Sequence, residues 1–141
     1  MKSSEIIEKL IRKAKAVAKA KELSNGNVAG SVGSALMTDK GNIYVGVSLD
    51  LCCGIGFCAE HSAIAAMVTA REYRVKYIVA VTEDGHILPP CGRCRELLKQ
   101  IDEWNYENTL IILSPSNVVP LKMLLPHPWE EGLKQQPLSL D

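Results

Sequence analysis

The chain has 141 residues, of which 47% are hydrophobic and 23% are charged, and its formal net charge is zero. This length suits one domain with a single core, which we expect to span residues 1–141. The chain lacks the basic excess of a nucleic-acid enzyme and has no apolar run long enough to cross a membrane, so we expect neither as a partner.

The sequence begins with an amphipathic helix, which we predict over Ser3–Glu22. Its apolar residues recur at helical spacing, which indicates that one face packs on the body of the protein. The basic side chains lie mostly off this face, and we interpret them as a solvated surface rather than a binding site. The apolar face comprises Ile6, Ile7, Leu10, Ile11, Ala14, Val17 and Ala18.

A hairpin of two strands follows this helix. The strands are predicted at Val32–Thr38 and Asn42–Ser48, and the turn sequence Asp39-Lys40-Gly41 lies between them.

The next part of the chain alternates between helices and strands. We predict helices at Cys58–Glu72 and Gly92–Glu103, and strands at Tyr77–Thr82 and Thr109–Leu113. This alternation favours parallel pairing of the later strands.

The segment after Pro120 contains a short apolar helix or strand. Pro126-His127-Pro128-Trp129 cannot form a regular helix, because proline lacks the amide hydrogen and clashes with the preceding turn. We expect the tail beyond about residue 130 to be loosely ordered.

Two cysteine motifs stand at the starts of the two later helices: Cys58-Ala-Glu60 and Pro90-Cys91-Gly92-Arg93-Cys94. Residues i and i+3 share a helix face, so the sulfurs of the second motif can converge, and the first motif adds a third thiolate at another helix start. A catalytic zinc uses three protein ligands and leaves its fourth position open. The motifs therefore predict a Zn²⁺ site formed by Cys58, Cys91 and Cys94.

Glu60 lies two residues from Cys58, beside the predicted metal site. Hydrolytic deamination moves a proton from the attacking water to a ring nitrogen and then to the departing ammonia. One carboxylate can make both transfers if its pKa is suitable. Three thiols with such a glutamate are typical of zinc deaminases, in which other members have His at the position of Cys58. We predict that Glu60 is the catalytic acid and base.

Two other interpretations of the cysteines stay open. A redox dithiol in the second motif would leave the first motif without a role. A structural zinc would leave Glu60 as a solvated helix residue, and it would need a fourth ligand, for which the candidates are Cys52, Cys53 and His61.

The cysteine motifs, the segments Val32–Thr38 and Gly41–Val47, and Leu124-Leu125-Pro126 together resemble the small cytidine deaminase and blasticidin-S deaminase family. The resemblance covers most of the chain. It implies a single-domain α/β fold, a three-layer α/β/α arrangement with a mixed central sheet. It also implies a homotetramer whose sites borrow residues from neighbouring subunits. The implied ligands are the three motif cysteines, and the implied proton shuttle is Glu60.

The same resemblance reveals departures around the expected substrate. Members carry an Asn and a Glu, two residues apart, that bind the ribose, and Ser48 and Asp50 stand in their places with shorter side chains. The aromatic residue that stacks on the pyrimidine aligns with Gly30. His61 replaces an Arg, and Glu96 replaces a Gln.

Several further residues are candidates for substrate contacts. Phe57 precedes the first motif, and Trp129 lies where related enzymes place an aromatic ring over the substrate. Ordinary packing is the alternative for both aromatics. Contacts to the edge of the base are assigned to Ser34 and Ala59. The predicted substrate-binding residues are thus Ser34, Ser48, Asp50, Phe57, Ala59 and Trp129.

The sequence therefore predicts a zinc-dependent hydrolytic deaminase of a cytidine-like aminopyrimidine nucleoside or a close analogue, which releases ammonia. A deaminase of blasticidin-S type or of another modified cytosine is the alternative within this class. A non-catalytic, zinc-stabilised binding module is the alternative from another class, against which the intact Glu60 argues. Five cysteines, three of them assigned to a metal, form no disulfide framework, so we expect a reducing cytoplasm.

Overall fold

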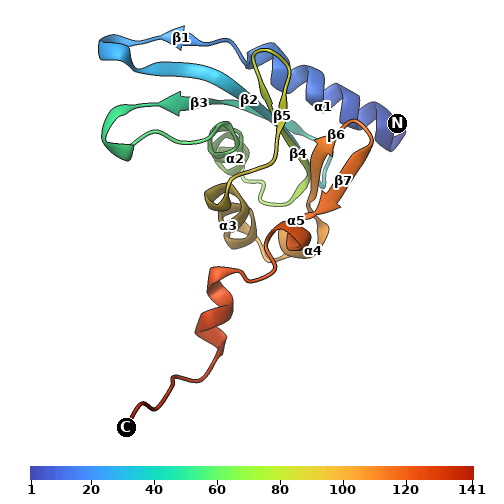
Figure 1. The fold of residues 1–141 in the computed structure, drawn as a ribbon. Helices are drawn as coiled ribbons and strands as arrows, with labels where there is room; N and C mark the ends of the chain where they lie inside the picture. Colours follow the sequence, from blue (N-terminus) through green and yellow to red (C-terminus); the bar gives the residue numbers. More distant parts are fainter.

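The centre of the molecule is a seven-stranded sheet in the computed structural model, which describes residues 1–141 (Figure 1). Strand β2 (Val28–Thr38) pairs antiparallel with β3 (Ile43–Asp50) and with β4 (Val75–Thr82). Strand β6 (Leu110–Ser114) pairs parallel with β4. The predicted hairpin and the parallel pairing of the later strands are both confirmed.

Three short strands extend this sheet at its edges. Strand β1 (Lys21–Glu22) pairs with the start of β2, β5 (Ile87–Leu88) with the end of β4, and β7 (Asn117–Pro120) with β6. All three pairings are antiparallel, so the complete sheet is mixed.

Helices cover both faces of the sheet and make three layers (Figure 1). Helix α1 (Ser3–Val17) packs on one face, and α2 (Ala59–Thr69) and α3 (Gly92–Ile101) pack on the other. The short helices α4 (Trp104–Asn108) and α5 (Leu121–Leu124) contact each other beside α3.

The period-two pattern of the strands divides the core between these faces. Along β2, Ala35 and Met37 contact the cluster under α1, whereas Leu36 contacts the cluster under α2 and α3. Strand β4 alternates in the same way, with Val79 on the α1 side and Ile78 on the other. This double coverage fixes the register, because a slip of one residue would exchange the two faces.

All three predicted helices end earlier than we predicted, and the second ends at Thr69 rather than Glu72. The first ends at Val17 rather than Glu22, because Lys21–Glu22 pair with the start of β2 instead. The third ends at Ile101, since Asp102 is extended and its carboxylate accepts the N–H of Trp104, which begins α4. Pairing with β2 thus ends the first helix, and the hydrogen bond of the Asp102 side chain ends the third, although composition alone favours longer helices.

Three 3₁₀ turns complete the chain: η1 (Ser24–Gly26), η2 (Cys52–Gly54) and η3 (Trp129–Lys134). The last turn and the exposed residues after it project away from the body of the molecule (Figure 1). The tail that we expected to be loose beyond about residue 130 therefore keeps helical structure to Lys134. None of the helices combines the length and the apolar character needed to span a bilayer.

Candidate functional site

The three motif cysteines lie at the N-terminal ends of α2 and α3, two helices on the same face of the sheet. Cys58 is the N-cap of α2, Cys91 is the N-cap of α3, and Cys94 lies one turn further on. The first backbone N–H groups of a helix have no partner within it, so both ends favour negative charge. The fold thus brings the cysteines from both motifs together at the positively polarised ends of two helices.

The distances between these sulfurs fit a metal. Cys58 Sγ lies 3.3 Å from Cys91 Sγ, which lies 3.5 Å from Cys94 Sγ, and all three thiols are free. Two sulfurs bound to one tetrahedral zinc at ~2.3 Å are about 3.8 Å apart, so a small expansion accommodates the ion. Burial raises the pKa of the Cys94 thiol, and the charge of the Glu60 carboxylate raises it further. Cys94 therefore needs a bound cation to lose its proton and become a thiolate.

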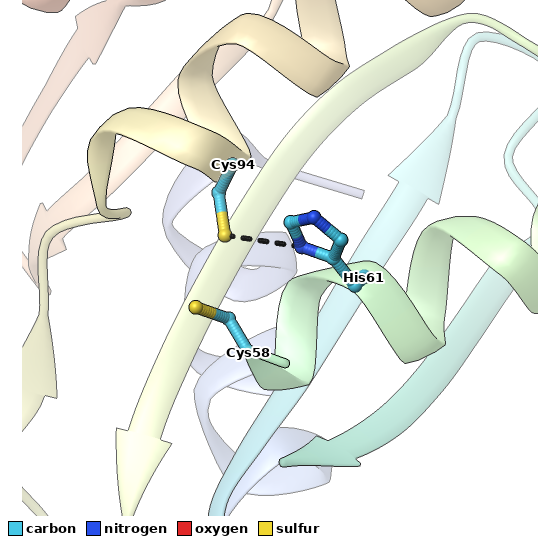
Figure 2. A group of neighbouring side chains, drawn as sticks. All are labelled: Cys58, His61 and Cys94. Carbon is cyan, nitrogen blue, oxygen red and sulfur yellow. Dashed lines mark hydrogen bonds between the residues drawn. The ribbon is translucent and has the colours of Figure 1, made fainter. Parts of the chain in front are cut away.

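His61 joins the cluster from the first turn of α2. Its Nδ1 lies 3.4 Å from Cys94 Sγ, and the ligand atoms of Cys58, His61 and Cys94 all lie within 4.8 Å of one another (Figure 2). The imidazole also stacks on Phe57, with ring centroids 6.1 Å apart. From the sequence, His61 was a candidate fourth ligand of a structural zinc and the replacement of an Arg. Its i+3 spacing from Cys58 was the signal that both share a helix face.

Glu60 projects from the same turn and is 5% exposed. Burial raises the pKa of its carboxyl, while hydrogen bonds from its own backbone N–H and from Cys94 partly oppose the shift. A raised pKa makes this carboxyl a better proton acceptor than an ordinary glutamate, which suits a group that takes up and returns a proton. His61 shifts in the opposite sense, because burial first, and then the charge of Arg93, lower its pKa and favour the neutral imidazole.

A cavity of about 680 Å³ opens beside these side chains, within the size range of small-molecule sites. Glu60, Cys58 and Cys91 form part of its wall. Four of the predicted substrate-binding residues also line it: Ser48, Asp50, Phe57 and Ala59.

Two predicted substrate-binding residues lie outside this cavity. Ser34 is fully buried within the sheet, and its hydroxyl donates to the Val79 carbonyl oxygen at 2.8 Å. Trp129 is 66% exposed on the projecting tail, where its backbone N–H donates to Glu96 Oε1 at 2.8 Å. Neither lines the cavity of its own chain, because the strand pairing and the tail direction set their positions.

The polar wall of the cavity is already hydrogen-bonded. Ser31 donates its hydroxyl to Asp50 Oδ2 at 2.7 Å, and Ser48 Oγ accepts the N–H of Val32 at 3.0 Å. These contacts leave Asp50 Oδ1 free as an acceptor, whereas the lone pairs of Ser48 are partly used.

Asn27 and Arg93 line the cavity but were not among the predicted site residues. Asn27 Oδ1 accepts the N–H of Cys52 at 3.2 Å and ties η1 to η2, and Arg93 Nη1 donates to the Gly56 carbonyl oxygen at 3.3 Å. The sequence signal for Asn27 was the Asn25-Gly26 turn that precedes it, in which both residues have positive φ.

Both cysteine motifs fall inside a match to a protein-family model. Residues 4–106 match the model described as the cytidine and deoxycytidylate deaminase zinc-binding region. Over 69 residues, 48% of the chain, the sequence is 32% identical to a protein named cytidine deaminase from Mycobacterium tuberculosis, and the match covers 52% of that relative. The chain thus spans about half the length of the curated relatives that it matches.

The fold is similar to crystal structures named cytidine deaminase. The one from Mycobacterium tuberculosis aligns with a TM-score of 0.72 at 27% identity and covers 86% of this chain and 95% of that chain. The one from Mycobacterium leprae aligns with a TM-score of 0.70 at 29% identity and covers 85% and 97%. A third, from Burkholderia pseudomallei, has a TM-score of 0.67 at 24% identity and supports the fold alone. The predicted fold class is confirmed.

Proposed function

Because the chain belongs to the cytidine and deoxycytidylate deaminase zinc-binding family, we propose that it is a zinc-dependent hydrolase that removes the amino group of a cytidine-like aminopyrimidine nucleoside, or a close analogue, as ammonia. One observation carries this proposal: three thiols and a buried carboxylate converge beside a cavity of about 680 Å³. Its relatives named cytidine deaminase from two mycobacteria support the substrate class.

In this proposal Cys58, Cys91 and Cys94 hold Zn²⁺, which fits their separations and their positions at two helix N-termini. When bound, the ion supplies Lewis-acid activation of water. Three thiolates leave a net negative charge around a divalent cation, which the two helix ends and the Arg93 guanidinium at the cavity wall offset.

Glu60 makes the proton transfers. Its carboxylate takes a proton from the attacking water and delivers it to a nitrogen of the pyrimidine ring. It then takes the second proton of that water, from the new hydroxyl group, and delivers it to the amino group, which leaves as ammonia. The burial that raises the pKa of Glu60 supports both directions of transfer. The carboxylate also lies on the cavity wall, within reach of a bound ring.

The remaining cavity residues bind and orient the substrate. Phe57 offers an apolar surface for the base, and the backbone at Ala59 offers hydrogen bonds to the base edge. Ser48 and Asp50 lie on the wall proposed for the sugar side, where the free Oδ1 of Asp50 can accept a hydroxyl.

Isotope labelling tests the hydrolytic route. The zinc-loaded protein should convert cytidine to uridine, and in H₂¹⁸O the product should carry one ¹⁸O at the carbon that lost the amino group, as measured by mass spectrometry. Cytidine recovered unchanged, or a product without label, would contradict the proposal.

We also propose a cytoplasmic homotetramer. Exposed apolar side chains on the projecting tail, Trp129 and Leu133 among them, support burial against another subunit. Five free cysteines suit a reducing compartment. Light scattering after size-exclusion chromatography should give four times the mass of one chain; a monomeric mass would contradict this assembly.

A further inference from the structure

We propose that His61 is a positioning residue of the metal centre. Its Nδ1–H donates to Cys94 Sγ and holds that sulfur as a ligand, while the imidazole itself stays off the metal. This inference rests on the zinc site of the proposed function, and it assigns a role to the side chain that follows the catalytic glutamate.

The contact joins two helices. His61 lies in the first turn of α2, Cys94 lies in the first turn of α3, and Nδ1 and Sγ are 3.4 Å apart. Figure 2 shows the imidazole beside the sulfur of Cys94, with the sulfur of Cys58 directed into the same space. Stacking on Phe57, with an interplanar angle of 26°, fixes the ring plane.

The position of the cavity argues that His61 is a donor and not a fourth ligand. Cys58, Cys91 and Glu60 line the cavity, whereas neither His61 nor Cys94 does. Water and substrate therefore reach the metal position from the cavity, on the side of Cys58, Cys91 and Glu60. His61 contacts Cys94 on the side away from the cavity. A fourth protein ligand would close the site, which is the arrangement of structural zinc.

The chemistry of the ligand set explains why such a donor is useful. Three thiolates give the centre an excess of negative charge, and an N–H directed at one sulfur withdraws part of it. Hydrogen-bonding partners of metal ligands commonly contribute 10–100-fold to metal affinity. Cys94 is fully buried, so no solvent molecule can replace the imidazole N–H at this sulfur.

Cobalt substitution tests the role without using activity. In the Co²⁺-loaded protein, the sulfur-to-cobalt charge-transfer band reports the number of thiolates by its intensity and their electron density by its wavelength. His61→Phe keeps an aromatic ring but removes the N–H. We expect its band to move to longer wavelength at unchanged intensity, with zinc affinity ~10–100-fold weaker by chelator competition.

A matched variant separates hydrogen bonding from packing. In His61→Asn the side-chain amide lies where Nδ1 lies, so it should restore the wavelength and most of the affinity although it loses the stacked ring. Cys94→Ser, which removes one thiolate, calibrates the intensity. Circular dichroism confirms that each variant is folded.

Three outcomes would overturn the inference. Imidazole scattering in the X-ray absorption spectrum of the zinc-loaded wild type, lost in His61→Phe, would make His61 a ligand. If the band of His61→Phe is not shifted, or if the band of His61→Asn is shifted, His61 acts only through packing. If the wild type instead binds Co²⁺ without a three-thiolate band, the proposed zinc site itself fails, which is a distinguishable result.

Discussion

Glu60 and its three cysteine neighbours are the residues on which the proposed chemistry depends. Each occupies the first turn or the N-cap of a helix, so the backbone that positions it is rigid and hydrogen-bonded. Burial raises the pKa of Glu60, and the cavity gives a ring access to its carboxyl. The site therefore places the carboxylate that we propose as proton carrier beside the proposed metal position.

Replacing this carboxylate should separate binding from catalysis. Glu60→Gln keeps the shape of the side chain but can neither accept nor return a proton, so we expect turnover to fall by ~10⁴-fold or more, with zinc content and fold retained. Turnover and metal analysis check this together. The control is Glu107→Gln, an exposed partner of Lys122, which should behave as wild type. Near-parental ammonia release by Glu60→Gln would remove Glu60 from the mechanism.

Sugar recognition should be weak. Ser48 Oγ already accepts a backbone N–H and Asp50 Oδ2 already accepts the Ser31 hydroxyl, so Asp50 Oδ1 is the one fully free side-chain acceptor that these two residues offer the sugar. A site built to bind a hydroxyl can reject an analogue without it by ~10⁴–10⁵-fold. Here we expect removal of a sugar hydroxyl to lower kcat/KM by less than about tenfold. The measurement compares kcat/KM for cytidine and its deoxy analogues. A steep ribose preference abolished by Asp50→Ala would show instead that Asp50 binds the sugar.

The sequence was sufficient to predict residues for the metal and for acid–base chemistry, because their chemistry is encoded in short motifs, and the structure brings these side chains together. It was less informative for residues whose role depends on tertiary contacts. Ser34 lies two residues after Val32, which lines the cavity, yet the hydroxyl of Ser34 donates to the Val79 carbonyl oxygen on the paired strand β4. The i+3 spacing places His61 on the helix face of Cys58, but its contact with the sulfur of Cys94, 33 positions away, depends on the packing of α2 beside α3.

At the scale of elements, α2 must lie close to β3 for Cys58 and Glu60 to reach the cavity. Gly46 permits this approach, because a Cβ there would lie 2.3 Å from the Ala63 backbone nitrogen. The same contact explains why a residue without a side chain occupies the middle of a strand.

Gly46→Ala should push α2 off the sheet. We expect a loss of ~1–3 kcal/mol or more in the free energy of unfolding, measured by denaturant titration, together with weaker zinc binding. Gly132→Ala is the control, since a Cβ there has no atom within 4 Å, and it should change stability by less than ~0.5 kcal/mol. Equal stability of the two variants would mean that the packing of α2 is not limited by Gly46.

Glu72 connects the segment after α2 to the hairpin. Its Oε2 accepts the hydroxyl of Tyr44 at 2.6 Å and the amide of Asn42 at 3.0 Å. The hydrogen bond from Tyr44, followed by those from Thr38 and Asn42 and by the charge of Lys40, holds the pKa of Glu72 below its usual range. The ionised form is thus the one that stabilises the fold.

A depressed pKa contributes stability above the unfolded value of ~4.3, and this stability is lost as the pH falls through the lower native value. Glu72→Gln should therefore have a lower melting temperature than wild type at pH 7, by an amount that shrinks below about pH 4. Melting curves of both proteins at several pH values check this. A difference that stays constant from pH 7 to pH 3.5 would exclude an electrostatic origin.

Element boundaries were predicted less well than the elements themselves. Amphipathic spacing identifies α1, but the polar residues after Ala18 fit a helix and a strand equally well, and pairing with β2 decides between them. Strands β5 and β7 are too short to show a periodic pattern, so they depend on their neighbours β4 and β6.

At the scale of the whole molecule, the metal site links α2 to α3 and so couples the folding of two helices to zinc. Anything that binds only the native state stabilises it, by about 2.7 kcal/mol at 100-fold excess over Kd. Removing zinc with a chelator should lower the melting temperature of wild type, and readdition should restore it. Cys94→Ala should melt at the lower temperature with and without the chelator. If the melting temperature of wild type does not change on chelation, bound zinc does not stabilise the fold.

The central claim is that this molecule deaminates a cytidine-like compound, and ammonia release by the zinc-loaded protein tests it most directly. The panel should contain cytosine, cytidine, deoxycytidine and substituted cytosine analogues, blasticidin S among them. We predict stoichiometric ammonia and the oxo product from at least one nucleoside of this panel, and none after Glu60→Gln. No ammonia from any member, with zinc bound and the fold intact, would contradict the account and favour a non-catalytic zinc-stabilised binding module.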